Sequence, residues 1–335
     1  MSRKTHQRPR TAVVFGGCGF VGRYVTAGLL RRGWRVVAVS RRPRRDLLPL
    51  GNPGQITLAR LDFRTLARDN PDNSAALTSL LRDCDAAVNL VGILHTRRPG
   101  GFRAVHAAAA GAIATAAREA GAGRLVHVSA LGAAAESASR YGRSKGIGEK
   151  LVLENYPRAA VLRPSVIFGK EDDFLNRFAA LLRGLPAFPL FGGGETKFQP
   201  VYVGDVARAI VRLAADSDDS FTPPPWGKAF DLGGPEVMTL RHLLERVAYE
   251  TGWRRKFVNV PFGAAAAMSA PFVVLPRPPL TPDQVLLLRE DNIAASDGFA
   301  ALGMESEPLG FRLGEIVGRY GRAYRMRSGE APDSS

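Results

Sequence analysis

Short apolar runs alternate with longer stretches of helical spacing through the first half of the chain. Each run has the length and the β-branched content typical of a buried strand. The pattern predicts strands over residues 11–15, 35–40, 56–61, 86–94, 124–129 and 159–162, and helices from residue 20 onward and over 102–120 and 141–155. Because strands that alternate with helices form parallel sheets with right-handed crossovers, we expect an α/β fold with a doubly wound parallel sheet.

The regular alternation ends at Gly169, and the composition then turns to Pro and Gly. Regions of this kind cover the carboxyl ends of the strands, where doubly wound folds bind ligands. We therefore predict a first domain over residues 1–169 and a region facing a substrate or partner over residues 170–325. Within the second region, residues 198–203 and 230–232 have the pattern of strands that rejoin the sheet. The polar tail, residues 326–335, is expected to be disordered.

The turn between the first strand and the first helix, within Thr11–Val25, is rich in glycine. Glycines in such a turn permit a tight bend, bring the backbone close to a pyrophosphate, and let the helix pack closely on the strand. The helix N-terminus adds N–H groups and a partial positive charge. Because the glycines stand between a buried strand and a helix, they predict a dinucleotide-binding domain of the Rossmann type. The residues expected at the cofactor are Gly16, Gly17, Gly19, Phe20, Val21 and Gly22.

The composition is that of an ordinary globular protein except for its charge. Apolar residues make up 45% of the 335 residues and charged residues 23%, but the formal net charge is +15. Such a charge favours anionic partners: nucleotides, an anionic membrane surface or an acidic protein. The chain has no zinc-finger spacing and no aromatic-basic RNA signature, so we expect no nucleic-acid partner. Cys18 and Cys84 are too few for a metal cluster or a disulfide framework, which indicates a reducing compartment and no metal site.

One uncharged run, from Phe257 to Pro276, reaches the length of a membrane span. Pro261, Gly263 and Pro271 interrupt it, and consecutive alanines make it only mildly apolar, which disfavours a span. Two interpretations stay open. The run is either a helix packed on the same chain, or a docking surface for a membrane face or a partner.

The end of the second predicted strand bears on the choice between NAD(H) and NADP(H). NAD-binding folds commonly place an acid there to hold the ribose hydroxyls, whereas this chain has Ser40, Arg41 and Arg42. Guanidinium groups pair bidentately with a phosphate, which an acid would repel. The three residues favour NADP(H), with its extra 2′-phosphate. A solvated Arg-rich loop beside NAD(H) is the alternative.

Four residues at the ends of the third and fourth strands complete the expected cofactor site. Asp62 can accept a hydrogen bond from the adenine amino group, and Phe63 follows it. Val91 and Gly92 lie where little side-chain bulk would let the cofactor pass. An exposed loop Asp and a plain turn Gly are the alternatives for Asp62 and Gly92.

Tyr141 and Lys145 are four residues apart, so a helix places them on one face, where both can act on one ligand. A nearby ammonium favours the phenolate and lowers the pKa of the Tyr toward a value useful for proton transfer to or from a carbinol. Ser129 ends the strand that precedes this helix. We predict these three residues both as catalytic and as cofactor-binding.

Together these features resemble an extended or atypical short-chain dehydrogenase/reductase over nearly the whole chain. Besides the glycine turn and the residues above, the string LRPSVIFG carries the likeness, and its Arg163 and Pro164 are expected at the cofactor. More narrowly, four strings resemble the nucleotide-binding accessory subunits of respiratory complex I, alpha subcomplex subunit nine, and their bacterial relatives. They are SRYGRSKGIGEK (139–150), RPSVIFGKEDDFLNRFA (163–179), GGGETKFQPVYVGDVA (192–207) and LTPDQVLLLREDN (280–292).

This narrower resemblance implies a tightly held NADPH and a role usually regarded as structural. It implies contact with subunits of the peripheral arm of complex I near the quinone end. It also implies a peripheral location on the cytoplasmic face of a bacterial inner membrane, or on the matrix side in a mitochondrion.

One departure from the broader family weakens the case for catalysis. Active members carry a Ser or Thr directly after the first Ser beyond the fifth strand, whereas Ala130 follows Ser129 here. Losing one preorganised donor typically costs about a hundredfold or more in rate. Two functions stay open: an NADP(H)-binding assembly or stability factor of complex I, or an active enzyme. The enzyme would be an NADPH-dependent reductase or an NAD-dependent epimerase/dehydratase acting on a nucleotide sugar or a quinone-related substrate.

Overall fold

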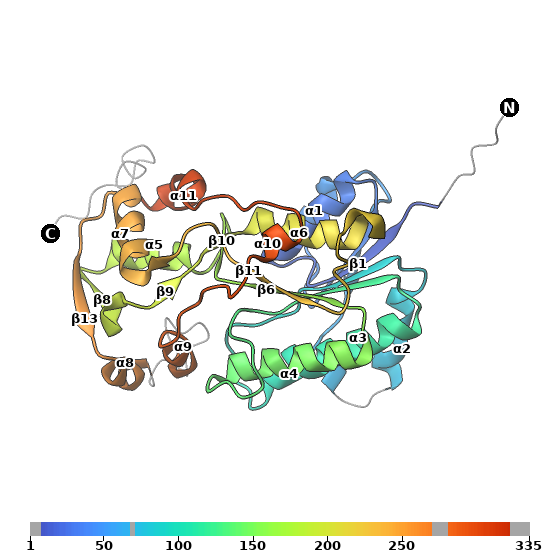
Figure 1. The fold of residues 1–335 in the computed structure, drawn as a ribbon, viewed down its shortest axis with the longest axis horizontal. Helices are drawn as coiled ribbons and strands as arrows, with labels where there is room; N and C mark the ends of the chain where they lie inside the picture. The colour runs from blue at the N-terminus through green and yellow to red at the C-terminus, as the bar shows by residue number, and fades with distance from the viewer. Residues whose placement is uncertain (1–7, 68–70, 270–280, 322–335) are drawn as a thin grey trace. The chain divides into compact units, whose positions relative to one another are not determined.

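Seven parallel strands form the central sheet of the computed structural model, which describes residues 8–67, 71–269 and 281–321 (Figure 1). The sheet order reverses between β1 and β4, which is the switch point at which doubly wound sheets bind nucleotides. The predicted α/β fold is therefore confirmed. In spatial order the strands are β3 (Ile56–Arg60), β2 (Arg35–Ser40), β1 (Thr11–Phe15), β4 (Ala86–Asn89), β5 (Arg124–Val128), β6 (Ala160–Pro164) and β11 (Ala229–Leu232).

Helices cover both faces of this sheet (Figure 1). On one face lie α1 (Phe20–Arg31) and α6 (Val203–Ala215). On the other face lie α2 (Pro71–Leu81), α3 (Ala109–Glu119) and α4 (Arg140–Asn155). A π-helical turn over Arg103–Ala108 leads into α3.

The sheet and the helices α2 and α3 enclose an apolar core. In the parallel register of the sheet, Val13 lies opposite Val37 on one side and Ala87 on the other. Phe15 and Ile113 are fully buried in the same core. Central strands of a parallel sheet are covered on both faces, which explains why β1 reads as a continuous apolar run.

The chain divides into two compact units that interleave along the sequence. One unit consists of Met1–Ser129, Ser144–Leu162 and Ala207–Ala229, and the other of Ala130–Arg143, Arg163–Val206 and Phe230–Ser335. The glycine turn, the ends of β2 to β5 and Lys145 belong to the first unit; Tyr141, Arg163 and Pro164 belong to the second. A domain boundary at residue 169 stays a prediction.

The second unit has its own core, in which side chains such as Leu182, Leu243 and Leu313 are buried. Its helices are α5 (Leu175–Gly184), α7 (Leu240–Thr251), α8 (Phe262–Ser269), α9 (Pro282–Leu287), α10 (Gly298–Ala301) and α11 (Gly310–Val317). Its short strands pair as β8 (Ala187–Phe191) with β13 (Lys256–Val260), β7 (Ile167–Phe168) with β10 (Val201–Tyr202), and β9 (Lys197–Phe198) with β12 (Met238–Thr239).

Two strand predictions differ from the structure, and one is confirmed. Residues 230–232 join the central sheet within β11, as predicted. The prediction that residues 198–203 rejoin this sheet is wrong: β9 and β10 pair in two small sheets instead. Pro200 stands between them and has no N–H to continue a ladder. The fourth strand ends at Asn89 instead of Leu94. Beyond Asn89, the N–H of Val91 donates a hydrogen bond to the Asn89 side chain and not to a neighbouring strand.

The uncharged run from Phe257 is divided between a strand and a helix. It begins in β13, which pairs with β8 in parallel, and continues in α8, which packs against α9. Residues 270–276 of the run and the predicted tail, residues 326–335, lie outside the described residues. Within the described ranges, no helix combines the length and the apolar character that crossing a membrane requires. The docking interpretation stays a prediction.

Candidate nucleotide-binding site

Backbone contacts alone build the turn from β1 into α1. Gly16 has a φ of +86°, in the left-handed region, and its carbonyl accepts the N–H of Gly19 at 2.8 Å. A Cβ on Gly17 would lie 2.9 Å from the Cβ of Ala38, and a Cβ on Gly22 would overlap the carbonyl oxygen of Gly16. The helix therefore approaches the sheet as closely as it does only because side chains are absent, which is the packing role expected of these glycines.

The N-terminus of α1 is suited to an anion. Gly19 at the N-cap has no side chain to cap the helix, and the first turn, with Phe20 and Val21, contains no acid. By helix geometry the N–H groups of this turn have no partner within the helix. Their dipoles add to a partial positive charge at the carboxyl end of β1, which fits a pyrophosphate.

Two buried hydroxyls at strand ends also fit a polar ligand. Ser40 ends β2 and Ser129 follows β5; their side chains are almost fully buried. Among the residues that the structure describes, neither Oγ has a hydrogen-bond partner. A buried hydroxyl without a partner is costly, so both hydroxyls are suited to bind a ligand or a water molecule. Arg41 and Arg42 follow Ser40 directly and are exposed.

Asp62 is paired with an arginine that sequence reasoning missed. Nε of Arg64 donates to Oδ1 of Asp62 at 2.9 Å, and Nη2 donates to Oδ2 at 2.5 Å. The Arg64 side chain, opposed in part by burial, lowers the pKa of Asp62 to about 2. Phe63, between them, is buried and packs edge-on against Phe15 with ring centroids 6.4 Å apart. Its side chain therefore belongs to the core, and the adenine contact of Asp62 stays a prediction.

Asn89 fixes the end of β4 and the state of His127. Its Oδ1 accepts the N–H of Val91 at 3.0 Å, so its Nδ2 faces Nδ1 of His127 at 3.1 Å. Because that amide nitrogen can only donate, the His127 proton resides on Nε2, which is buried without a partner among the described residues. Burial, reinforced by Lys145, lowers the pKa of His127 to about 3. His127 is thus a neutral core residue.

Lys145 is buried in α4 beside the end of β5. Its Nζ donates to the carbonyl of Val128 at 3.1 Å. Burial lowers its pKa to about 8, although the nearby Glu149 acts in the opposite direction. A Cβ on Gly92 would stand only 3.5 Å from Nζ, so the missing side chain at this position leaves room beside the ammonium.

His106, in the π-helical turn before α3, is buried and is close enough to Lys145 for the ammonium to affect its pKa. Its Nε2 accepts the N–H of Ile93 at 3.0 Å, which leaves the proton on Nδ1 to be donated to Oγ of Ser144 at 2.8 Å. Burial first, and then Lys145, lower the pKa of His106 to about 2. His106 was missed by sequence reasoning, although a polar His within an Ala-rich segment is a signal that could have drawn attention to it.

Tyr141 lies in the first turn of α4, four residues before Lys145, as predicted. Burial raises its pKa to about 12, so the lowering expected from Lys145 is wrong for this structure. Arg163 and Pro164 both lie in β6; Nη1 of Arg163 is 3.9 Å from Oδ1 of Asp231. All the predicted site residues except Tyr141, Arg163 and Pro164 belong to the first unit.

Asp283 from α9 caps the helix that carries Tyr141, and sequence reasoning missed it as well. The carboxylate accepts the N–H of Arg140 at 2.7 Å, the N–H of Tyr141 at 3.1 Å and the hydroxyl of Ser139 at 3.0 Å. The two N–H groups are among the backbone donors that a helix start leaves without intrahelical partners. The string 280–292 marked the segment, but no local signal could reveal a cap supplied from so far along the chain.

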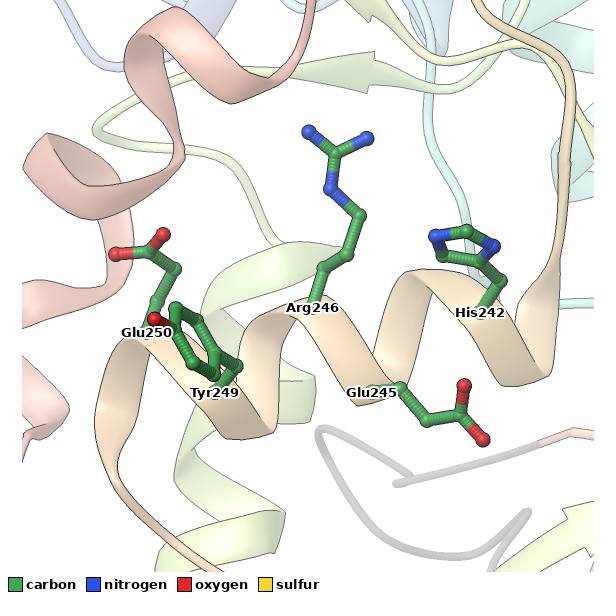
Figure 2. Close-up of a pocket in the computed structure, with 5 residues that line it drawn as sticks. All are labelled: His242, Glu245, Arg246, Tyr249 and Glu250. Carbon is green, nitrogen blue, oxygen red and sulfur yellow. The ribbon is translucent and has the colours of Figure 1, made fainter.

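A pocket of about 320 Å³ lies over α7 and does not coincide with these residues (Figure 2). All of its lining side chains project from that one helix: His242, Glu245, Arg246, Tyr249 and Glu250. Tyr249 is 85% exposed. The hollow is thus a feature of one exposed helix, and no residue predicted at the cofactor lines it.

Comparison with known proteins gives matches over most of the chain. Residues 12–226 match the model of the NAD dependent epimerase/dehydratase family. The mitochondrial NADH dehydrogenase (ubiquinone) 1 alpha subcomplex subunit 9 of Mus musculus is 35% identical over 332 residues, which are 96% of this chain and 83% of the relative. The subunit of the same name from Arabidopsis thaliana is 35% identical over 85% of this chain and 70% of its own length.

Solved structures show the same fold at lower identity. A dTDP-glucose 4,6-dehydratase from Bacillus anthracis, in complex with NAD, superposes with a TM-score of 0.69 at 15% identity, over 93% of this chain and 96% of that one.

We expect Asp283→Asn to lower the free energy of unfolding by about 1–3 kcal/mol, because the new amide NH₂ would face a buried donor. Equilibrium urea unfolding would measure the change, and amide exchange at Arg140 and Tyr141 should accelerate. Asp297→Asn is the matched control, because Asp297 caps α10 through a single oxygen, which Asn retains. Equal effects of the two substitutions would contradict the role assigned to Asp283.

Proposed function

This chain belongs to the NAD dependent epimerase/dehydratase family, and from that membership we propose that it binds NADP(H) as an accessory or assembly factor of a respiratory NADH:ubiquinone oxidoreductase. The family resemblance expected from the sequence is thereby confirmed. The observation that carries the proposal is the extent of the likeness to alpha subcomplex subunit 9, which spans 96% of this chain. The likeness therefore includes the second unit as well as the nucleotide fold.

The residues present fit a dinucleotide. When bound, NADP(H) supplies a hydride donor or acceptor at its nicotinamide. The glycine turn and the N-terminus of α1 would hold the pyrophosphate. Arg41 and Arg42 would pair with the 2′-phosphate, and Ser40, whose buried hydroxyl has no partner among the described residues, would bond to the adenosine ribose. The end of β2 carries no acid that would repel the 2′-phosphate, which supports NADP(H) over NAD(H).

The proposed partners are subunits of the peripheral arm near the quinone end, at the inner-membrane surface. A net charge of +15 supports contact with an anionic membrane or with acidic subunits. In a bacterium this location is the cytoplasmic face of the inner membrane, and in a mitochondrion it is the matrix side.

An active enzyme is the second candidate, and α4 supports it. Tyr141 and Lys145 lie four residues apart on one helix, and the pKa of Lys145 is lowered to about 8. Tyr141 would act as acid or base toward a substrate oxygen. Two observations favour the structural role: Ala130 lacks a hydroxyl, and burial raises the pKa of Tyr141 to about 12, which favours the neutral phenol.

Gentle purification from the native cell tests the proposal as a whole. We expect the chain to copurify with subunits of the respiratory NADH dehydrogenase and to carry bound NADPH, identified by its absorbance and by mass spectrometry after release. Purification of the chain with neither these subunits nor bound NADPH would overturn the proposal.

Substitutions at Gly22 and Tyr141 separate a structural nucleotide from a reacting one. Gly22→Ala should weaken NADPH binding more than tenfold, because the new Cβ displaces the turn that holds the pyrophosphate. Tyr141→Phe should leave assembly of the respiratory complex unchanged. Gly184→Ala is the control, since its Cβ would meet nothing within 4 Å. Gly22→Ala should also impair assembly of the respiratory complex. An equal loss of assembly with Tyr141→Phe would favour the enzymatic function.

Cofactor selectivity has a separate test at the end of β2. Arg41→Glu should weaken NADPH binding by about ten- to a hundredfold, because a charged hydrogen bond is lost and an anion is placed beside the 2′-phosphate. NADH binding should change less than threefold. Arg35→Glu, at the opposite end of the same strand, makes the same change of charge. Equal loss of both nucleotides in Arg41→Glu, measured by fluorescence titration, would refute the NADP(H) assignment.

A further inference from the structure

We propose that Arg64 determines selectivity for a 2′-phosphorylated dinucleotide by neutralising Asp62 at the adenosine end of the site. Arg64 thereby acts as a positioning residue for Asp62. This inference rests on the proposed binding of NADP(H) and adds a residue that lies outside the second strand and its Arg41–Arg42 pair.

The loop after β3 holds the two side chains in one geometry. Arg64 binds the Asp62 carboxylate twice. Its backbone N–H donates to Oδ1 at 3.1 Å, and its guanidinium donates to both carboxylate oxygens at 2.5–2.9 Å. Phe63 anchors the loop in the core, and Thr65 closes it by donating both its N–H and its hydroxyl to the carbonyl of Asp62. A bidentate guanidinium–carboxylate pair on a short anchored loop loses little conformational entropy on binding a ligand.

The pair lies at the edge where the 2′-phosphate is expected. Ser40 at the end of β2 is in register with Arg60 at the end of β3, and the N–H of Leu61 donates to the carbonyl of Ser40. The loop over Asp62–Arg64 therefore follows directly beside the end of β2. Arg41 is close enough to contribute to the lowered pKa of Asp62.

Charge decides what this edge can bind. An uncompensated Asp62 would repel a 2′-phosphate that carries almost two negative charges, and it would instead suit a ribose hydroxyl. Paired with Arg64, Asp62 contributes almost no net charge. Arg41 and Arg42 then leave the edge cationic, so that a phosphomonoester is attracted and Asp62 can still accept a hydrogen bond.

Arg64→Gln tests this arrangement by removing the guanidinium while Asp62 remains. Binding of 2′,5′-ADP and 5′-ADP to the full chain is measured by isothermal titration calorimetry. We expect 2′,5′-ADP to bind about tenfold more weakly than to the wild type, and 5′-ADP to change less than twofold. In Asp62→Asn/Arg64→Gln, which no longer carries the acid, affinity for 2′,5′-ADP should return to within about threefold of wild type.

Arg82→Gln, which removes an exposed charge from the same unit, controls for net charge and should change neither affinity. Equal loss of both ligands in Arg64→Gln would mean a structural role only and would overturn the inference. Failure of the double substitution to restore binding would overturn the neutralising mechanism. If the wild-type chain binds neither ligand, or does not prefer 2′,5′-ADP, the proposed NADP(H) function itself fails. An unchanged preference in Arg64→Gln refutes only the role of Arg64.

Discussion

The close contact of α1 and its glycine turn with β1 and β2 is the constraint on which the nucleotide site depends. Side chains at Gly17 or Gly22 would collide with the sheet or with the turn itself, and a Cβ on Gly16 would press within 3.3 Å of Leu90 after β4. With hydrogens in place of side chains, the helix N-terminus is held at the switch point of the sheet. Its backbone donors are then fixed before any ligand arrives, so that an anion can bind with little rearrangement.

Charge inside the first unit is arranged around one buried ammonium. Lys145 bonds to the carbonyl of Val128, and His106 and His127 are held neutral by burial and by that ammonium. Buried polar groups are stabilising only when nearly all their bonds are made. Here the N–H of Ile93 and the hydroxyl of Ser144 bond to both nitrogens of His106, and Asn89 bonds to one nitrogen of His127.

The same fold can hold a nucleotide that reacts or one that only stabilises the structure. Tyr141 and Lys145 lie four residues apart on α4, as the proposed enzyme would require, whereas Ala130 lacks a hydroxyl and burial raises the pKa of Tyr141 to about 12. The likeness to alpha subcomplex subunit 9, which spans 96% of the chain, supports the proposed structural role of the nucleotide in a complex. In the proposed arrangement, selectivity for the nucleotide depends on the balance of charges at the ends of β2 and β3, where Asp62 and Arg64 form an ion pair.

Local patterns determined much of this protein from the sequence alone. The strands β1 and β2, the start of α1, the glycine turn and the i, i+4 pair on α4 all follow from periodicity and spacing, because each depends on neighbours along the chain. The tertiary structure decided what distant residues do. It split residues 198–203 between two small sheets, brought Asp283 to the start of α4, paired Arg64 with Asp62, and raised the pKa of Tyr141 by burial. Hydrogen-bond partners and burial depend on which surfaces meet after folding, and a one-dimensional pattern does not contain that information.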